Sequence, residues 1–144
     1  MSDEIPTSTD ETNKWAGGVH IGALVIALLT AWAAGFGGML AAIIVWLIKK
    51  DESPFIRRHA AEAFNFNLSM FIYTLIFYAF AVFTGVSALL TLGLALVVTL
   101  PLALFAMLAA FILCIVWVWC TVQAAIAGFD GKDYRYPLTF RIMN

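Results

Sequence analysis

Five polar side chains in the middle of the chain recur at the spacing of one helix face: His59, Glu62, Asn65, Ser69 and Tyr73. Residues three or four apart lie on the same side of a helix, and we call this set the polar stripe. A histidine and a glutamate three residues apart can bind a metal ion, but only together with a second such pair. Because a polar group among apolar ones needs a partner, we expect the stripe to face another helix, a buried water or a passing substrate. Hydrogen bonding between helices is the simplest of these roles.

The other groups capable of chemistry do not form a catalytic or metal-binding set. His20, the sole other histidine, has no carboxylate near it in the sequence. Cys114 and Cys120 project from different faces of a helix, which favours packing over metal binding. Arg58 precedes Glu62 by one helical turn, and we expect a local ion pair between them. There is no nucleophile beside a base and no phosphate-binding loop. The sequence therefore predicts no enzyme, no metal and no cofactor.

The charged residues are confined to three short segments. The eight Lys and Arg and the nine Asp and Glu all fall within residues 3–14, 49–62 and 130–141, which leaves 15–48 and 63–129 free of charge. An ionised side chain at the centre of a bilayer costs ~2.5–3.5 kcal/mol, and charges are therefore excluded from spanning segments. With 63% apolar residues, the pattern predicts an all-α, polytopic membrane protein. No basic footprint for nucleic acid is present.

The first charge-free tract predicts two short helices. Residues 15–48 are too many for one perpendicular crossing and slightly few for two. Glycines at 35, 37 and 38 favour a tight reversal. We expect a first helix over about 15–34 and a second over about 39–48. A re-entrant hairpin or one long tilted helix is the alternative.

The second charge-free tract predicts two long crossings. Ser53 and Pro54 form a preferred helix start, as the N-cap and the first helical residue, and the helix continues through the membrane over 64–83. We expect a reversal between 84 and 93, a last helix that ends at Gly128, and a turn at Asp130 and Gly131 that leads the chain back along the surface. The expected fold is a four-helix transmembrane bundle with the first two helices short. It comprises a disordered tail (1–14), the bundle (15–129) and a cytoplasmic tail (130–144).

The basic residues predict the orientation. The positive-inside rule places these basic residues and both termini in the cytoplasm. We expect the protein itself to lie in the cell's inner, cytoplasmic membrane. There the basic residues attract anionic lipid headgroups or hold a partner protein. Tyr134 and Tyr136 suit the membrane interface. The expected cytoplasmic face consists of Lys49, Lys50, Arg57, Arg58, Lys132, Tyr134, Arg135 and Tyr136.

Two motifs carry a resemblance to a known family. The segments His59–Phe66 (HAAEAFNF) and Gly131–Leu138 (GKDYRYPL), with Trp15 and His20 near the start, resemble a widespread bacterial family of small membrane proteins of unknown function. That family is itself similar to the Tic-twenty-like chloroplast protein-import component family. The resemblance implies four membrane helices with both ends on one side, and a relation to protein translocation by analogy. Glu62 departs from the glutamine-rich form of the first motif.

Two functions are compatible with these features. The first is a non-enzymatic accessory or interaction subunit, which packs with another membrane protein or with itself through small residues such as Gly18 and Gly22. The alternative is a small channel or transporter-like conduit for ions, solutes or peptides, with the polar stripe lining a path. The first hypothesis predicts a complex, and the second predicts flux.

Overall fold

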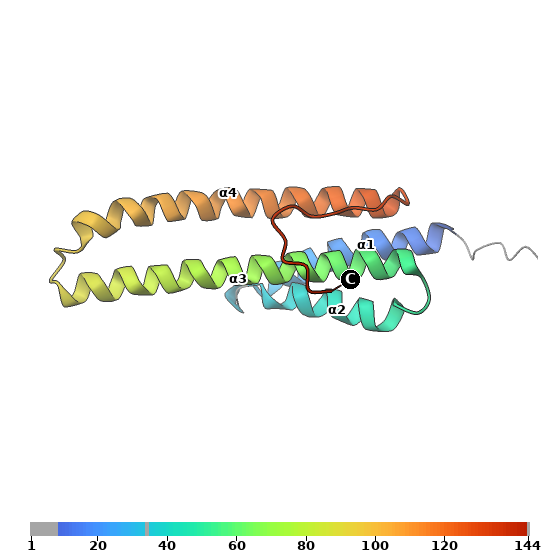
Figure 1. The fold of residues 1–144 in the computed structure, drawn as a ribbon, viewed down its shortest axis with the longest axis horizontal. Coiled ribbons are helices and arrows are strands. Elements are labelled where there is room, and N and C mark those ends of the chain that lie inside the picture. The colour runs from blue at the N-terminus through green and yellow to red at the C-terminus, as the bar shows by residue number, and fades with distance from the viewer. Residues whose placement is uncertain (1–8, 34, 144) are drawn as a thin grey trace, which may run out of the picture.

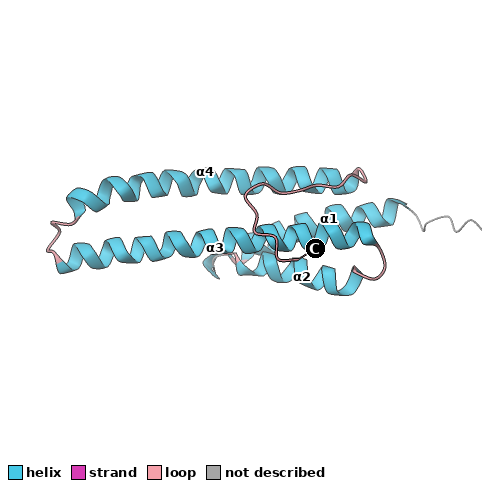
Figure 2. Ribbon diagram, viewed as in Figure 1, coloured by secondary structure: helices cyan, strands magenta, loops and turns pink. Residues whose placement is uncertain are grey.

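The described part of the chain forms four α-helices, which confirms the all-α class. The computed structural model describes residues 9–33 and 35–143, and this part of the chain contains no β-strand. Figures 1 and 2 show a long antiparallel pair, α3 and α4, with the shorter α1 and α2 packed against one half of it. The helices are α1 (Thr9–Leu29), α2 (Phe36–Lys49), α3 (Pro54–Leu90) and α4 (Leu96–Phe129), and a 3-10 turn, η1 (Ala31–Ala33), follows α1.

The start of α3 agrees with the sequence prediction. The side chain of Ser53 caps the helix by accepting a hydrogen bond from the Ile56 amide, and Pro54 is the first helical residue. Proline suits that position because it lacks an amide hydrogen, which would have no helical partner there. After α4, Gly131 adopts the left-handed conformation and turns the chain back, also as expected.

The α1–α2 hairpin differs from the prediction at both of its helices. The described part of α1 already starts at Thr9, before the expected position, and it contains an ion pair between Asp10 and Lys14 one turn apart. It therefore includes residues 9–14 of the expected tail, while residues 1–8 lie outside the described part. α1 also ends at Leu29, before the expected position, and α2 starts at Phe36. The Thr30 hydroxyl accepts a hydrogen bond from the Gly37 amide and closes the turn.

α3 extends beyond the expected crossing over 64–83, while the reversal into α4 falls within the expected range 84–93. α3 continues to Leu90 because the segment beyond Phe83 contains no proline to stop it. The reversal occurs at Leu92 and Gly93, which both have positive φ. The distal halves of the two helices expose large apolar side chains, such as Val82, Phe83, Phe105 and Phe111. Both helices are long and apolar enough to cross a membrane.

Two glycines bring α1 and α4 into close contact. A Cβ atom on Gly128 would lie 2.6 Å from the backbone nitrogen of Gly17, and one on Gly17 would lie 2.6 Å from the Phe129 ring. Gly18 and Gly22, which we expected to mediate helix contact, have no atom within 4 Å of such a Cβ. Gly17, and not the adjacent Gly18, therefore contacts α4, because the packing of all four helices sets which face of α1 meets α4.

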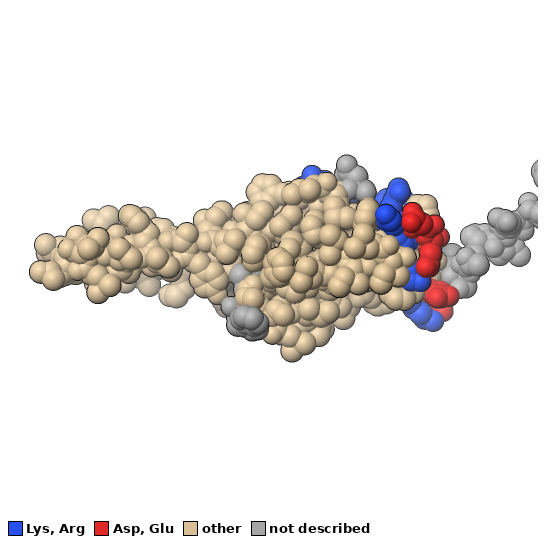
Figure 3. All heavy atoms as spheres, turned by 90° about the horizontal axis from the view of Figure 1, so that it is seen from below, with Lys and Arg blue, Asp and Glu red and all other residues tan. Residues whose placement is uncertain are grey.

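The charged side chains gather at one end of the molecule. Figure 3 shows Lys, Arg, Asp and Glu around the end where α3 begins and α4 finishes, whereas the tip of the α3–α4 hairpin carries none on this face. Lys49 pairs with Glu52 at 2.6 Å, and its ammonium lies 4.7 Å from the centre of the Trp15 ring. Lys50 lies in the same way over Trp46. The two lysines of the expected basic loop thus contact the rings of Trp15 and Trp46.

Replacing Gly128 with alanine should destabilise the bundle. The added methyl would meet the backbone of α1, which cannot move without shifting the helix, and overpacking of this kind costs about 1–3 kcal/mol. We expect a lower midpoint of thermal unfolding, followed by tryptophan fluorescence in detergent. Gly85→Ala in α3 is the matched control, because nothing lies within 4 Å of its added Cβ. Equal midpoints for the two variants would contradict the proposed close contact.

Candidate functional site

The segment after α4 packs against α3 and forms the candidate site. Residues 132–143, which we call the strap, turn back from the end of α4 and cross to α3 (Figure 1). The strap has no helix or strand of its own. Its backbone groups therefore need hydrogen-bond partners outside regular secondary structure. The polar stripe on α3 provides them.

His59 and Glu62, at the N-terminal end of the polar stripe, bind the first half of the strap. The Nε2 atom of His59 lies 3.1 Å from the carbonyl oxygen of Lys132. One carboxylate oxygen of Glu62 accepts a hydrogen bond from the Tyr136 amide at 3.1 Å. The other carboxylate oxygen lies 3.5 Å from the Arg141 guanidinium. Glu62 therefore binds the strap through its backbone and through an ion pair at the same time.

Asn65, Ser69 and Tyr73, which follow in the polar stripe, bind the second half of the strap. Asn65 accepts hydrogen bonds from two consecutive strap amides, at 3.0 and 2.9 Å, and donates to the carbonyl of Met143 at 2.7 Å. The Ser69 hydroxyl accepts from the Phe140 amide at 2.8 Å. The Tyr73 hydroxyl donates to the carbonyl of Leu138 at 2.9 Å. Leu138 has a φ of 53°, a strained conformation for this residue type, and the bond from Tyr73 holds it in place.

All five stripe residues are thus used by the strap. Their position on one helix face and their need for partners agree with the prediction, but the expected partner was another helix, a water or a substrate. The structure assigns this role to backbone atoms of an irregular segment more than sixty residues away. The expected ion pair between Arg58 and Glu62 is wrong, because Arg58 pairs with Asp133 of the strap at 2.9 Å.

A chain of three buried side chains connects the strap to α1. The Tyr136 hydroxyl lies 2.9 Å from Nδ1 of His20, and Nε2 of His20 lies 2.8 Å from Nδ1 of His59. His59 must donate from Nε2, because the carbonyl of Lys132 has no proton to give. Nδ1 of His59 is then the acceptor for His20, and Nδ1 of His20 is the acceptor for Tyr136. For neutral imidazoles, the hydrogen bond to the Lys132 carbonyl therefore fixes one direction for the whole chain.

Tyr136 belongs to the core and not to the expected cytoplasmic face. Its side chain is 2% exposed and stacks on Phe66 with ring centres 3.9 Å apart. Burial raises the pKa of Tyr136 well above its ordinary value, so its hydroxyl keeps the proton that it donates to His20. Burial also raises the pKa of Tyr134 to about 12. Tyr134 is half-buried, and its ring packs edge-on against that of Tyr136.

The other members of the expected face lie at the charged end. Lys132 pairs with Asp130 at 3.0 Å, and Arg135 lies 4.0 Å from Glu62. The pair between Arg58 and Asp133 joins the first turns of α3 to the strap. The described residues contain no group of three or more His, Cys, Asp or Glu side chains that could hold a metal ion.

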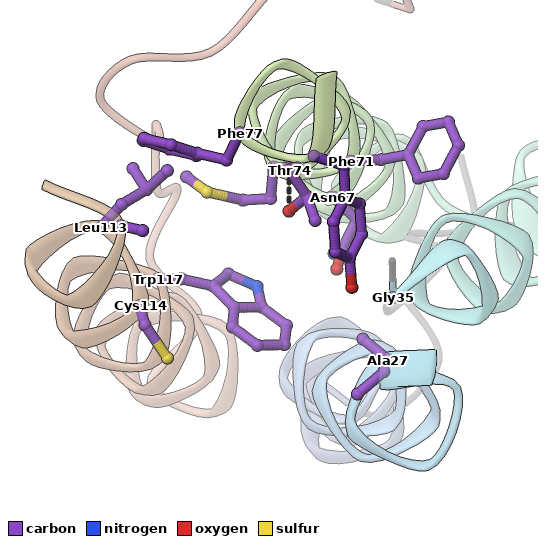
Figure 4. A pocket seen from close by; sticks show the side chains of 13 residues that line it. Ala27, Gly35, Asn67, Phe71, Thr74, Phe77, Leu113, Cys114 and Trp117 are labelled. Atoms are coloured by element: carbon purple, nitrogen blue, oxygen red, sulfur yellow. Dashed lines mark hydrogen bonds between the residues drawn. The ribbon is translucent and has the colours of Figure 1, made fainter. Parts of the chain in front are cut away.

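A second feature is an apolar cavity of about 360 Å³ between the helices. Figure 4 shows side chains of α3 and α4, together with Ala27 and Gly35 from the α1–α2 hairpin, around this space. The indole nitrogen of Trp117 is buried and has no hydrogen-bond partner in the described part of the chain. Cys114 contributes to the lining, while Cys120 packs in the core beside Tyr136. The cavity lacks the paired acid and base that catalysis would need.

Removing the hydroxyl of Tyr136 should loosen the strap. Tyr136→Phe keeps the stacked ring but leaves Nδ1 of His20 without a donor in a buried position, which costs about 1–3 kcal/mol. We expect a lower unfolding midpoint and faster proteolytic cleavage within residues 132–143. Tyr78→Phe is the control, since Tyr78 is exposed. Unchanged cleavage of the Tyr136 variant would show that the hydrogen-bonded chain does not hold the strap.

Comparison with known proteins gives one informative result. Neither the curated proteins nor the solved structures gave a match. A model of the MamF/MmsF family, described as the magnetosome magnetite crystal formation protein family, matches residues 11–143. This match overturns the resemblance to the Tic-twenty-like protein-import family, and with it the relation to protein translocation.

The reason for that error lies in the two motifs that suggested it. His59–Phe66 and Gly131–Leu138 are segments through which α3 and the strap contact one another. Such contacts are a requirement of the fold, and a fold does not specify a biological process. The family match, in contrast, extends over nearly the whole sequence. This chain therefore belongs to the magnetosome magnetite crystal formation protein family.

Proposed function

We propose that this chain is a non-enzymatic integral protein of the magnetosome membrane, which takes part in magnetite crystal formation as an accessory subunit. Family membership supports the setting and the process. The observation that carries the mode of action is the separation of charge along the molecule. Every Asp, Glu, Lys and Arg lies within residues 3–14, 49–62 and 130–141, and residues 63–129 contain none.

The lengths of the helices support a specific placement in the membrane. At ~1.5 Å per residue, a 37-residue helix such as α3 is about 55 Å long, and the hydrocarbon core is only ~30 Å thick. α2 has 14 residues, or about 21 Å, which is too short to cross. The α3–α4 hairpin therefore crosses the bilayer, while the α1–α2 hairpin enters from the charged end and turns back inside it.

The basic residues favour one orientation of the hairpin. Lys49, Lys50, Arg57 and Arg58 place the charged end in the cytoplasm by the positive-inside rule, so the tip faces the crystal side. Proteins bind iron mainly through histidine, carboxylate and thiolate groups. Residues 84–104 around the tip contain none of these side chains. The chain then acts on crystal formation through packing with other membrane components, and not by coordinating iron at the tip.

The use of the polar stripe favours this function over a conduit. A conduit would need polar side chains that are free to contact the transported species. In this structure the stripe residues form hydrogen bonds with the strap instead. An accessory subunit needs no such path, because its contacts lie on its outer surface.

Cysteine labelling tests the placement. In a chain with both native cysteines replaced, we expect a membrane-impermeant maleimide to label Lys50→Cys and Lys132→Cys from the same side, and Thr91→Cys from the opposite side. Thr91 is exposed at the end of α3 and is therefore accessible once the hairpin has crossed. Labelling of Thr91→Cys from the same side as Lys50→Cys would exclude a crossing hairpin.

Genetic complementation in a magnetosome-forming cell tests the role. Deletion of the gene should change the size or number of magnetite crystals in electron micrographs, and a fluorescent fusion should concentrate at magnetosomes. In the deletion strain, the Gly85→Ala protein should restore the crystals. The Gly128→Ala protein should not restore them, even when it is equally abundant in the membrane, because the substitution disturbs the α1–α4 contact. Unchanged crystals after deletion would refute the proposed role.

A further inference from the structure

A polar cavity of about 320 Å³ lies between the start of α3 and the strap. Three arginines and two carboxylates line it: Arg58, Arg135, Arg141, Glu62 and Asp133. Its position is defined by Glu62, the last charged residue of α3 before the charge-free tract begins. In a membrane-inserted chain, this is the level at which lipid headgroups meet the hydrocarbon.

The two carboxylates in the cavity are already neutralised. Arg58 donates two hydrogen bonds to Asp133, at 2.9 and 3.2 Å. Glu62 is 14% exposed and pairs with Arg141, whose guanidinium also donates to the carbonyl of Tyr136. Arg135 is different, because its side chain is 77% exposed and only a distant 4.0 Å contact links it to Glu62. The cavity thus has a net charge of +1, centred on a guanidinium whose donors remain accessible.

An apolar strip lies next to this cavity on the strap. Leu138, Phe140 and Ile142 are all exposed, by 64%, 49% and 67%. They alternate with Thr139 and Arg141, so that every second residue presents a large apolar side chain outward. Arg141 stands between two members of the strip and belongs to the cavity at the same time. A cationic cavity and an apolar strip are therefore side by side on one short segment.

We propose that this cavity binds the phosphate of an anionic membrane phospholipid. The guanidinium groups of Arg135 and Arg141 donate to the phosphate oxygens, which arginine suits because its donors match such groups in pairs. The acyl chain of the same lipid lies along Leu138, Phe140 and Ile142. The strip is what favours a lipid over a free phosphate ion, since an inorganic ion would leave it uncovered. This proposal depends on membrane insertion and not on the role in crystal formation.

Spin-labelled lipids provide the test. The purified full chain is placed in phosphatidylcholine vesicles with spin-labelled phosphatidylglycerol or phosphatidylcholine, and electron paramagnetic resonance gives the fraction of immobilised label. One cation at the membrane surface contributes ~1 kcal/mol, so we expect about a fivefold preference for the anionic lipid. Arg135→Gln should abolish this preference without changing the unfolding midpoint, because Arg135 is exposed.

Lys132→Gln is the matched control for charge. It removes one exposed cation of the strap, but Lys132 pairs with Asp130 and does not line the cavity. The preference should survive in this variant. An equal loss in both variants would mean that general surface charge attracts the lipid, and it would overturn the proposal.

Inorganic phosphate distinguishes the two sources of the ligand. At an ionic strength matched with chloride, added phosphate should leave the labelled phosphatidylglycerol bound, since the ion cannot replace the contact with the strip. Displacement by phosphate as complete as that by unlabelled phosphatidylglycerol would identify a phosphate-ion site and refute the lipid site. Wild-type protein with no preference between the two labelled lipids would refute it as well.

Discussion

The need of buried polar groups for partners is the constraint on which the rest of this structure depends. An irregular strap that packs against helices brings amides and carbonyls into a region with little water, where each unpaired group is costly. The polar stripe of α3 meets this need over its whole length, from His59, which binds Lys132 of the strap, to Tyr73, which binds Leu138. α1 joins the same network through His20, which contacts both His59 and Tyr136. The strap thereby connects α1 and α3 to the end of α4.

This arrangement divides the molecule into two parts with different roles. The part near the charged end contains the strap, the core and every ion pair of the described residues. The distal part is a bare hairpin whose apolar side chains face outward. Lipid satisfies such a surface, and so does another membrane protein, whereas water does not. Membership of the magnetosome magnetite crystal formation family gives this division its biological setting.

The sequence predicted one part of the candidate site, the polar stripe, but not the strap that binds to it. The stripe could be found because helical spacing leaves a regular mark, and five polar residues on one face of an apolar helix require an explanation. The strap left no comparable mark, because its contribution comes mainly from backbone amides and carbonyls that every residue has. His20 was missed as a member of the site for a related reason. Its partners are remote in sequence, and Tyr136 had been assigned to the membrane interface from its residue type alone.

The sequence by itself determined the helical class, the apolar tracts, the start of α3 at Ser53 and Pro54, and the turn at Gly131, since these follow from local chemistry and from the exclusion of charge by lipid. The tertiary structure decided which groups meet: Gly17 with Gly128, Glu62 with the strap, and His20 with His59 and Tyr136. The physical reason is that helix formation depends on neighbours along the chain, whereas pairing between distant residues depends on how all the helices pack together.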